Sequence, residues 1–251
     1  MGNGRFARGL IEQLDGWVND LAAPLLPARA VPEGEDLIRL EFRQHIPHGV
    51  MIGKLVRAVS GIRASLILAD LGYVTECAAL LRMVSDLCTE VLAVGEALNS
   101  GGEPPAALRT FVEQYFARKS RTPEEFAAEE RARYVTREEL MKAEGRLAET
   151  ANLDREQLRV VHRFLNMSFD AYVHGDYETT MELYNRLTGR FDVGGHPDAL
   201  KRAEFVEAVF LKLHEVVVAL EFTAAVTAHA AVFRAVREAR NVMDASDPWK
   251  L

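Results

Sequence analysis

The sequence has little cysteine and no excess of positive charge, and each shortage excludes a class of protein. It has only two cysteines, Cys77 and Cys88, which stand eleven positions apart on one predicted helix. That spacing is about 16 Å along a helix axis, too far for a disulfide, so we expect two buried thiols in a reducing cytoplasm. The net charge of −7 disfavours a protein that coats nucleic acid or anionic membrane through bulk electrostatics.

Long apolar runs are missing too. The most apolar stretch, 206–233, is interrupted by Lys212, Glu215 and His229 among others, and no unbroken run approaches the roughly 20 residues that cross a bilayer. Residues 1–10 contain no apolar core, so we expect neither a membrane span nor a signal peptide. With 49% apolar and 27% charged residues, the composition is that of a soluble globular protein and excludes a disordered or fibrous chain.

Sequence motifs for metal, phosphate and nucleophile sites are absent. The chain has no HExxH, no cysteine and histidine array with zinc spacing, and no Glu-x-x-His pair of the di-iron bundles. It also has no P-loop, no GxGxxG and no GxSxG. We therefore expect no metal and no cofactor.

What the sequence does contain is a series of helix signals. Residues 122–125 (Thr-Pro-Glu-Glu) form a capping box with proline in the first helical position, and similar starts follow at 136–139 and 154–157. Glycine pairs at 101–102 and 194–195 indicate stops. Between these signals apolar residues recur every three or four positions, and no segment alternates as a strand would. The segmentation predicts helices at 5–22, 34–45, 48–70, 73–99, 105–119, 123–132, 137–150, 154–173, 177–188 and 198–243.

These patterns predict an all-α fold, an antiparallel helical bundle formed by residues 1–251 as a single domain. We expect core helices at about 48–100, 154–188 and 198–243. Residues 119–150 are charged and include few large apolar residues, so we expect a peripheral helical arm at about 105–150 that lies over the bundle or acts as a hinge.

The predicted C-terminal helix is apolar nearly all the way round between residues 205 and 233, so it should be buried on every side. Unbroken, residues 198–243 would span about 69 Å, which is long for a chain of this size. Two alternatives follow. The helix bends near Glu221–Thr223 into two ordinary helices, or it is a central bundle helix that also contributes to a homodimer.

Two polar stripes could carry chemistry. On helix 154–173, His162, Asn166 and Asp170 are four residues apart, and His174 continues the spacing. Such groups could bind a phosphodiester and move a proton, since histidine titrates near neutrality. The alternative is the solvated side of an amphipathic helix. Ser168 lies inside the apolar arc of the same helix, where a serine usually bonds to the carbonyl four residues earlier.

The second stripe is Arg82, Asp86 and Glu90 on helix 73–99, flanked by small residues. It is either an exposed ladder, worth a few tenths of a kcal/mol, or a polar contact between helices whose arginine binds an anion. A further row, Arg234, Arg237 and Arg240, could contact phosphates or form solvated surface.

A family resemblance rests on the segments LGYVTECAALLRMVSDLCTEVL (71–92) and RFLNMSFDAYVHGDYETTMELY (163–184). They resemble a family of uncharacterised bacterial helical proteins with a glycine-led helix, an arginine followed one turn later by an acidic residue, and a downstream Ser…His-Gly segment. The likeness covers about residues 50–184. It maps to Gly72, Arg82, Asp86, Ser168, His174 and Gly175.

That family is in turn distantly similar to the HEPN superfamily, many members of which are metal-independent ribonucleases of toxin–antitoxin and phage-defence systems. Their hallmark is an arginine followed after four to six residues by a histidine, usually paired across a dimer. Here Ser168 stands where that arginine would precede His174, so the resemblance implies either that catalysis has been lost or that Arg82 supplies the charge from a neighbouring helix. The pair Arg155 and His162 is a secondary candidate.

The resemblance implies a cytoplasmic HEPN-like protein, an RNA-cleaving or RNA-binding effector of stress or phage defence. His174 and Arg82 would be its catalytic residues in a shared crevice, supported by Asp86, Asn166, Ser168 and Asp170. The alternatives are a non-catalytic protein–protein interaction or oligomerisation module, and a small-anion sensor that uses Arg82. The expected partners are a second copy, bound through the C-terminal helix, and RNA.

Overall fold

The structure is a computed structural model that describes residues 2–25, 28–32, 38–99, 106–117, 169–174 and 177–246. This part of the chain is helical apart from two short hairpins, which confirms the all-α fold. Its elements are α1 (Gly2–Ala22), a 3-10 turn (Ala23–Leu25), β1 (Arg29–Pro32), β2 (Ile38–Glu41), α2 (Pro47–Leu71), α3 (Val74–Asn99), α4 (Ala106–Phe116), α8 (Tyr177–Met181), β3 (Tyr184–Asn185), β4 (Arg190–Phe191), α9 (Ala199–Val226) and α10 (Ala230–Ser246).

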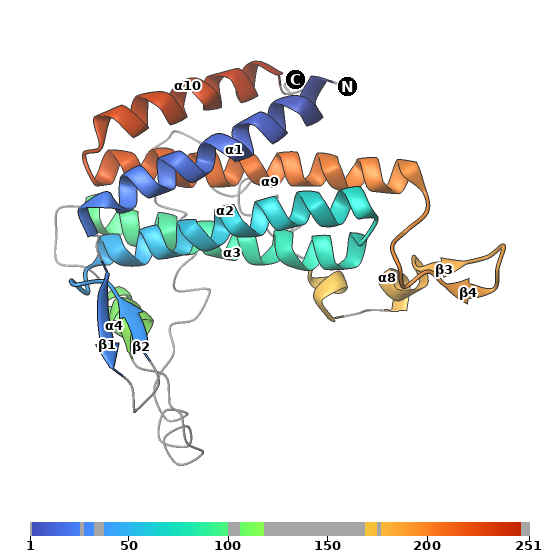
Figure 1. The fold of residues 1–251 in the computed structure, drawn as a ribbon, viewed down its shortest axis with the longest axis horizontal. Helices are drawn as coiled ribbons and strands as arrows, with labels where there is room; N and C mark the ends of the chain where they lie inside the picture. Colours follow the sequence, from blue (N-terminus) through green and yellow to red (C-terminus); the bar gives the residue numbers. More distant parts are fainter. Residues whose placement is uncertain are drawn as a thin grey trace, which may run out of the picture.

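The core lies between α2, α3 and α9, which run side by side along the longest axis of the molecule, while α1 and α10 cover α9 (Figure 1). Leu55, Leu81 and Leu213, one from each central helix, are fully buried. Small residues bring the helices close together. A Cβ added at Gly61 of α2 would lie 2.7 Å from Val84 of α3, so the two helix backbones approach more closely there than larger residues would allow.

The junction between α2 and α3 depends on glycine. Gly72 has φ +86° and ends α2 in the left-handed conformation, where its N–H donates to the carbonyl of Ala69 at 3.1 Å. A Cβ at this position would also lie 2.6 Å from the carbonyl oxygen of His196. The predicted boundary between helices 48–70 and 73–99 is therefore confirmed within one residue at each end, and the loop before α9 rests on it.

The C-terminal segment is two helices and not one. α9 ends at Val226 and α10 begins at Ala230, so the predicted bend at Glu221–Thr223 is placed several residues too early. α10 folds back along α9 and α1 (Figure 1), and most of the apolar surface of α9 is covered within the chain, while Leu200 and Leu211 stay exposed. Glu221 is buried and joins the two helices, because its carboxylate accepts from Arg237 at 2.7 Å and Arg240 at 3.0 Å.

Two predicted helices are wrong over most of their length. Residues 38–41 of the predicted helix 34–45 form β2, which pairs with β1 in an antiparallel hairpin. The cross-strand pair Arg29–Glu41, at 2.6 Å, supports this register. The predicted helix 177–188 ends at Met181, and the residues after it form the hairpin of β3 and β4. The side chain of Asn185 favours the turn of this hairpin, because its Oδ1 accepts from the N–H groups of residues 187 and 188.

Other predictions are confirmed or lie outside the described residues. The predicted helix 105–119 is α4, and the thiols of Cys77 and Cys88 are buried, as expected. No helix in the described ranges is long and apolar enough to cross a membrane. The predicted helices 123–132 and 137–150, most of the peripheral arm and residues 154–168 lie outside the part of the chain that the structure describes.

Candidate functional site

Arg82 on α3 is held between two carboxylates. Its side chain is almost fully buried, with 9% of the residue exposed. The Nε atom donates to Oδ1 of Asp170 at 2.6 Å, and Nη1 forms an ion pair with Asp86 one turn along the same helix. Of the two alternatives for this stripe, the structure has the contact between segments, because Asp170 belongs to the helical residues 169–174.

The charge of Arg82 is stabilised by these partners. Burial alone would lower the pKa of the guanidinium, but the hydrogen bonds and charges of Asp86 and Asp170 outweigh burial, and the pKa lies above its ordinary value. Two carboxylates against one guanidinium leave a formal charge of −1. An incoming phosphate would therefore have to displace a carboxylate of the chain before it could reach Arg82.

Glu90, the third member of the predicted stripe, has a different partner. Its carboxylate is 2.5 Å from Nζ of Lys54 on α2. The Lys54 ammonium also lies 5.5 Å from the ring centroid of Phe111 and 5.4 Å from that of Tyr115, both on α4. Glu90 therefore helps to fix α4 against α2 and α3, away from Arg82.

Next to Arg82 lies a second buried polar group that the sequence analysis missed. Nζ of Lys212 on α9 donates to Glu215 Oε1 at 2.6 Å and to Ser85 Oγ on α3 at 3.2 Å. The Ser85 hydroxyl in turn donates to Glu215 Oε2 at 2.8 Å. Lys212 is 3% exposed, and its ammonium lies 5.6 Å from the ring centroid of Phe169. The signal was a charged pair, three residues apart, in the most apolar part of α9.

Together these contacts attach residues 169–174 to the bundle. Asp170 bonds to α3 through Arg82, and the Phe169 ring lies beside Lys212 of α9. The Ser85 hydroxyl both accepts from Lys212 and donates to Glu215, so its hydrogen-bonding capacity is largely used. Chemically, the arrangement is a buried polar network whose charges are paired with one another, and its main effect is to fix the position of a segment.

His174 lies one turn beyond Asp170 and faces solvent. It is exposed and forms no hydrogen bond or ion pair with the residues that the structure describes. Tyr172, from the same turn, packs inward: its hydroxyl donates to Glu182 at 3.0 Å, and its ring meets Phe205 edge-on at 5.7 Å. Burial and the charge of Glu182 raise the pKa of Tyr172. The structure thus brings Arg82 to Asp170 and gives no contact between Arg82 and His174.

The remaining candidates cannot be placed. Asn166, Ser168, Arg155 and His162 lie outside the described residues, as does Gly175. Within the described ranges, no group of three or more histidine, cysteine, aspartate and glutamate side chains could hold a metal ion.

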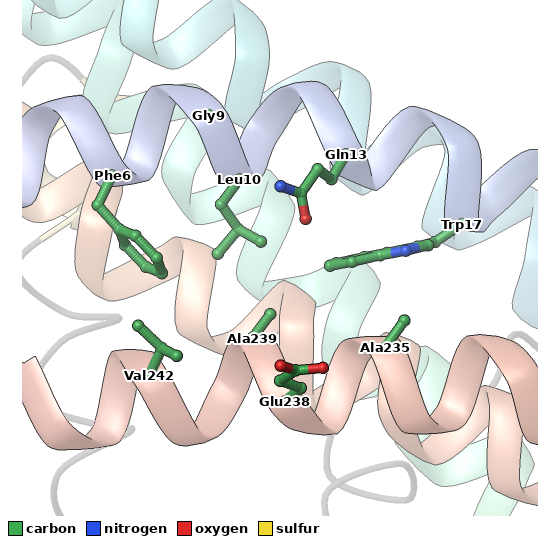
Figure 2. A pocket seen from close by; sticks show the side chains of 9 residues that line it. All are labelled: Phe6, Gly9, Leu10, Gln13, Trp17, Ala235, Glu238, Ala239 and Val242. Atoms are coloured by element: carbon green, nitrogen blue, oxygen red, sulfur yellow. The ribbon is translucent and has the colours of Figure 1, made fainter.

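A different feature is open to solvent, a groove between α1 and α10 with a volume of about 410 Å³. Side chains from both helices point into it (Figure 2), and they are mostly apolar or small. Val242 is 47% exposed, and a Cβ added at Gly9 would meet nothing within 4 Å. The lining residues are Phe6, Gly9, Leu10, Gln13 and Trp17 of α1, with Ala235, Glu238, Ala239 and Val242 of α10.

Of the predicted arginine row, two members do not face this groove. Arg237 and Arg240 both bond to the buried Glu221 of α9. Arg234 is exposed, and no ion pair joins it to the residues of the described ranges.

No family model matches the chain, and neither a curated protein nor a solved structure matches it.

Proposed function

We propose that this chain is a non-catalytic interaction module that self-associates through the face formed by α1 and α10. The observation that carries the proposal is the open groove between these helices. Its lining positions recur at three and four residues on both helices, which is the spacing of a face that receives another helix. The residues that line the groove are mostly small or apolar, and Gln13 and Glu238 add polar groups to the lining (Figure 2).

The occupant that fits best is a second copy of the chain. α10 offers the face with an exposed cation, Arg234, and an anion, Glu238, one turn apart. A surface that carries both charges on one helix can be complementary to itself about a two-fold axis. Val242 supplies exposed apolar area beside these charges.

The state of Arg82 supports a non-catalytic role. Metal-independent RNA cleavage by the predicted pair would need a guanidinium that meets the phosphate beside a histidine. Arg82 instead has two carboxylate partners from its own chain and little exposure. The HEPN-like, RNA-cleaving function stays a prediction from the resemblance, and the anion sensor stays a prediction from the polar stripe that contains Arg82.

Self-association is tested by light scattering of the purified protein from low micromolar to about 100 µM. We expect the mass of a dimer for the unmodified chain and of a monomer for Val242→Glu. The matched control is Val193→Glu, because Val193 is also exposed, at 80%, but lies beyond β4, far from the groove. A monomer throughout the range for the unmodified chain refutes the proposal.

Catalysis is tested separately by incubation with mixed RNA in EDTA, beside a His174→Ala variant. We expect intact RNA with both proteins. Cleavage that survives chelation and disappears in the variant would overturn the non-catalytic part of the proposal and favour the HEPN-like function.

A further inference from the structure

We infer that the helix which occupies the groove is α10 of the second copy, antiparallel to α10 of the first, so that Arg234 of each subunit faces Glu238 of the partner subunit. This inference rests on the proposed self-association and specifies its register. It follows from the way in which α10 distributes its side chains.

Two sides of α10 are occupied by contacts within the chain. Val232, Val236 and Met243 point into the core and are buried. Arg237 and Arg240 point toward α9, where Glu221 binds both. The side that remains carries the groove residues together with Arg234. On this side, Arg234 and Glu238 are one turn apart, and their charges are therefore available to a partner.

An antiparallel pair related by a two-fold axis makes every contact twice. If the axis passes at the level of Val236, midway between Arg234 and Glu238, each arginine lies opposite a glutamate. A shift of one turn in either direction would place Glu238 against Glu238, or Arg234 against Arg234, and like charges would then face each other. The charge pattern thus favours one register over its neighbours.

The groove floor provides room for the incoming helix. A glycine in the interior of a helix costs about 1 kcal/mol relative to alanine. At Gly9 no side chain of the chain itself occupies the space that a Cβ would take. A helix lying over Gly9 would use this space, and the exposed Val242 beside it would be covered.

The register is tested by charge reversal, with dimerisation measured by sedimentation equilibrium and folding by far-UV circular dichroism. We expect Arg234→Glu and Glu238→Arg each to weaken dimerisation about tenfold or more, because two exposed pairs become two repulsions. The double variant should dimerise within about threefold of the unmodified chain. The control is Arg186→Glu, an exposed arginine in the turn between β3 and β4, which should change nothing.

Mixing the two single variants gives a second readout. The variant Arg234→Glu carries acidic residues at both 234 and 238, and the variant Glu238→Arg carries basic residues at both. In a heterodimer of the two, acidic positions face basic positions, so the mixture should form heterodimers more readily than either variant forms homodimers. If the unmodified chain dimerises but these variants dimerise equally well, or the double variant is not restored, the register is wrong while self-association stands. If the unmodified chain is a monomer, the proposed function fails and this inference fails with it.

Discussion

Replacing Lys212 with methionine should destabilise the fold more than replacing Arg82 with methionine. The ammonium is 3% exposed and donates to Glu215 and to Ser85. Its removal leaves the Glu215 carboxylate, whose side chain is 19% exposed, with the Ser85 hydroxyl as its remaining donor in this group. Breaking a buried pair costs about 3–5 kcal/mol. The partial exposure of Glu215 favours the lower end, so we expect about 3 kcal/mol, or a fall in Tm of roughly 6–12 °C.

The same reasoning orders two further variants. Arg82→Met should cost less, about 1–2 kcal/mol, because the side chains of Asp86 and Asp170 are 40% and 43% exposed and can be solvated by water. In the triple variant Ser85→Ala, Lys212→Met, Glu215→Leu, no charge is left in the group of Ser85, Lys212 and Glu215. This variant should therefore recover most of the stability lost in Lys212→Met. The measurement is urea unfolding followed by far-UV circular dichroism. A cost below about 1 kcal/mol for Lys212→Met, or a larger one for Arg82→Met, would refute the reasoning.

For three other changes the structure determines the direction of the effect on stability. In the Val242→Glu variant, which we expect to be a monomer, Gly9→Ala should raise the free energy of unfolding by about 0.8–1.0 kcal/mol, since a Cβ there meets nothing of its own chain within 4 Å; no gain in a urea titration would contradict this. Gly95→Ala should lower it by about 1–3 kcal/mol, because its Cβ would lie 2.6 Å from Phe222 and 2.7 Å from Met51, and a stabilised variant would show that the packing is looser. Burial raises the pKa of the Cys77 thiol from about 9 to about 12. Between these two pH values the thiol keeps its proton in the folded chain and loses it in the unfolded chain. Cys77 should therefore contribute stability that is fully present below pH 9 and is lost as the pH rises toward 12. Cys77→Ala should remove that part of the pH dependence, and an identical profile in the variant would refute it.

Sequence patterns predicted the helices whose ends are determined locally. The predicted helices 48–70 and 73–99 leave Gly72 in the gap between them, and the structure has its left-handed cap at that glycine. The turn between α9 and α10 could not be predicted in this way, because Thr227, Ala228 and His229 include neither glycine nor proline. Ala228 has φ 56°, a conformation that is costly for an alanine. Packing of α10 on α9 and α1 must outweigh this cost, and such packing is not visible in a local pattern.

The candidate site was predicted in part for a similar reason. Arg82 and Asp86 are four residues apart on one helix, so their ion pair can be predicted from the spacing alone. The contact of Arg82 with Asp170 joins residues 88 positions apart, and it depends on which helix faces which. Lys212 and Glu215 were interpreted as interruptions of an apolar stretch, and Ser85 was not singled out. Their role follows only from the packing of α3 against α9, which buries the charge of Lys212 and so requires partners for it.

The arginine row on α10 shows why residue type and spacing do not determine a role. Positions three apart on an α-helix turn by about 300°, so each arginine of the row points about 60° away from the previous one. The buried Glu221 on α9 binds Arg237 and Arg240, and the side chain that is left outward is Arg234. Two arginines of the row therefore hold α10 on its own chain, while the third is available to a partner. The position of one glutamate on the neighbouring helix makes this division, and no pattern within α10 itself could have indicated it.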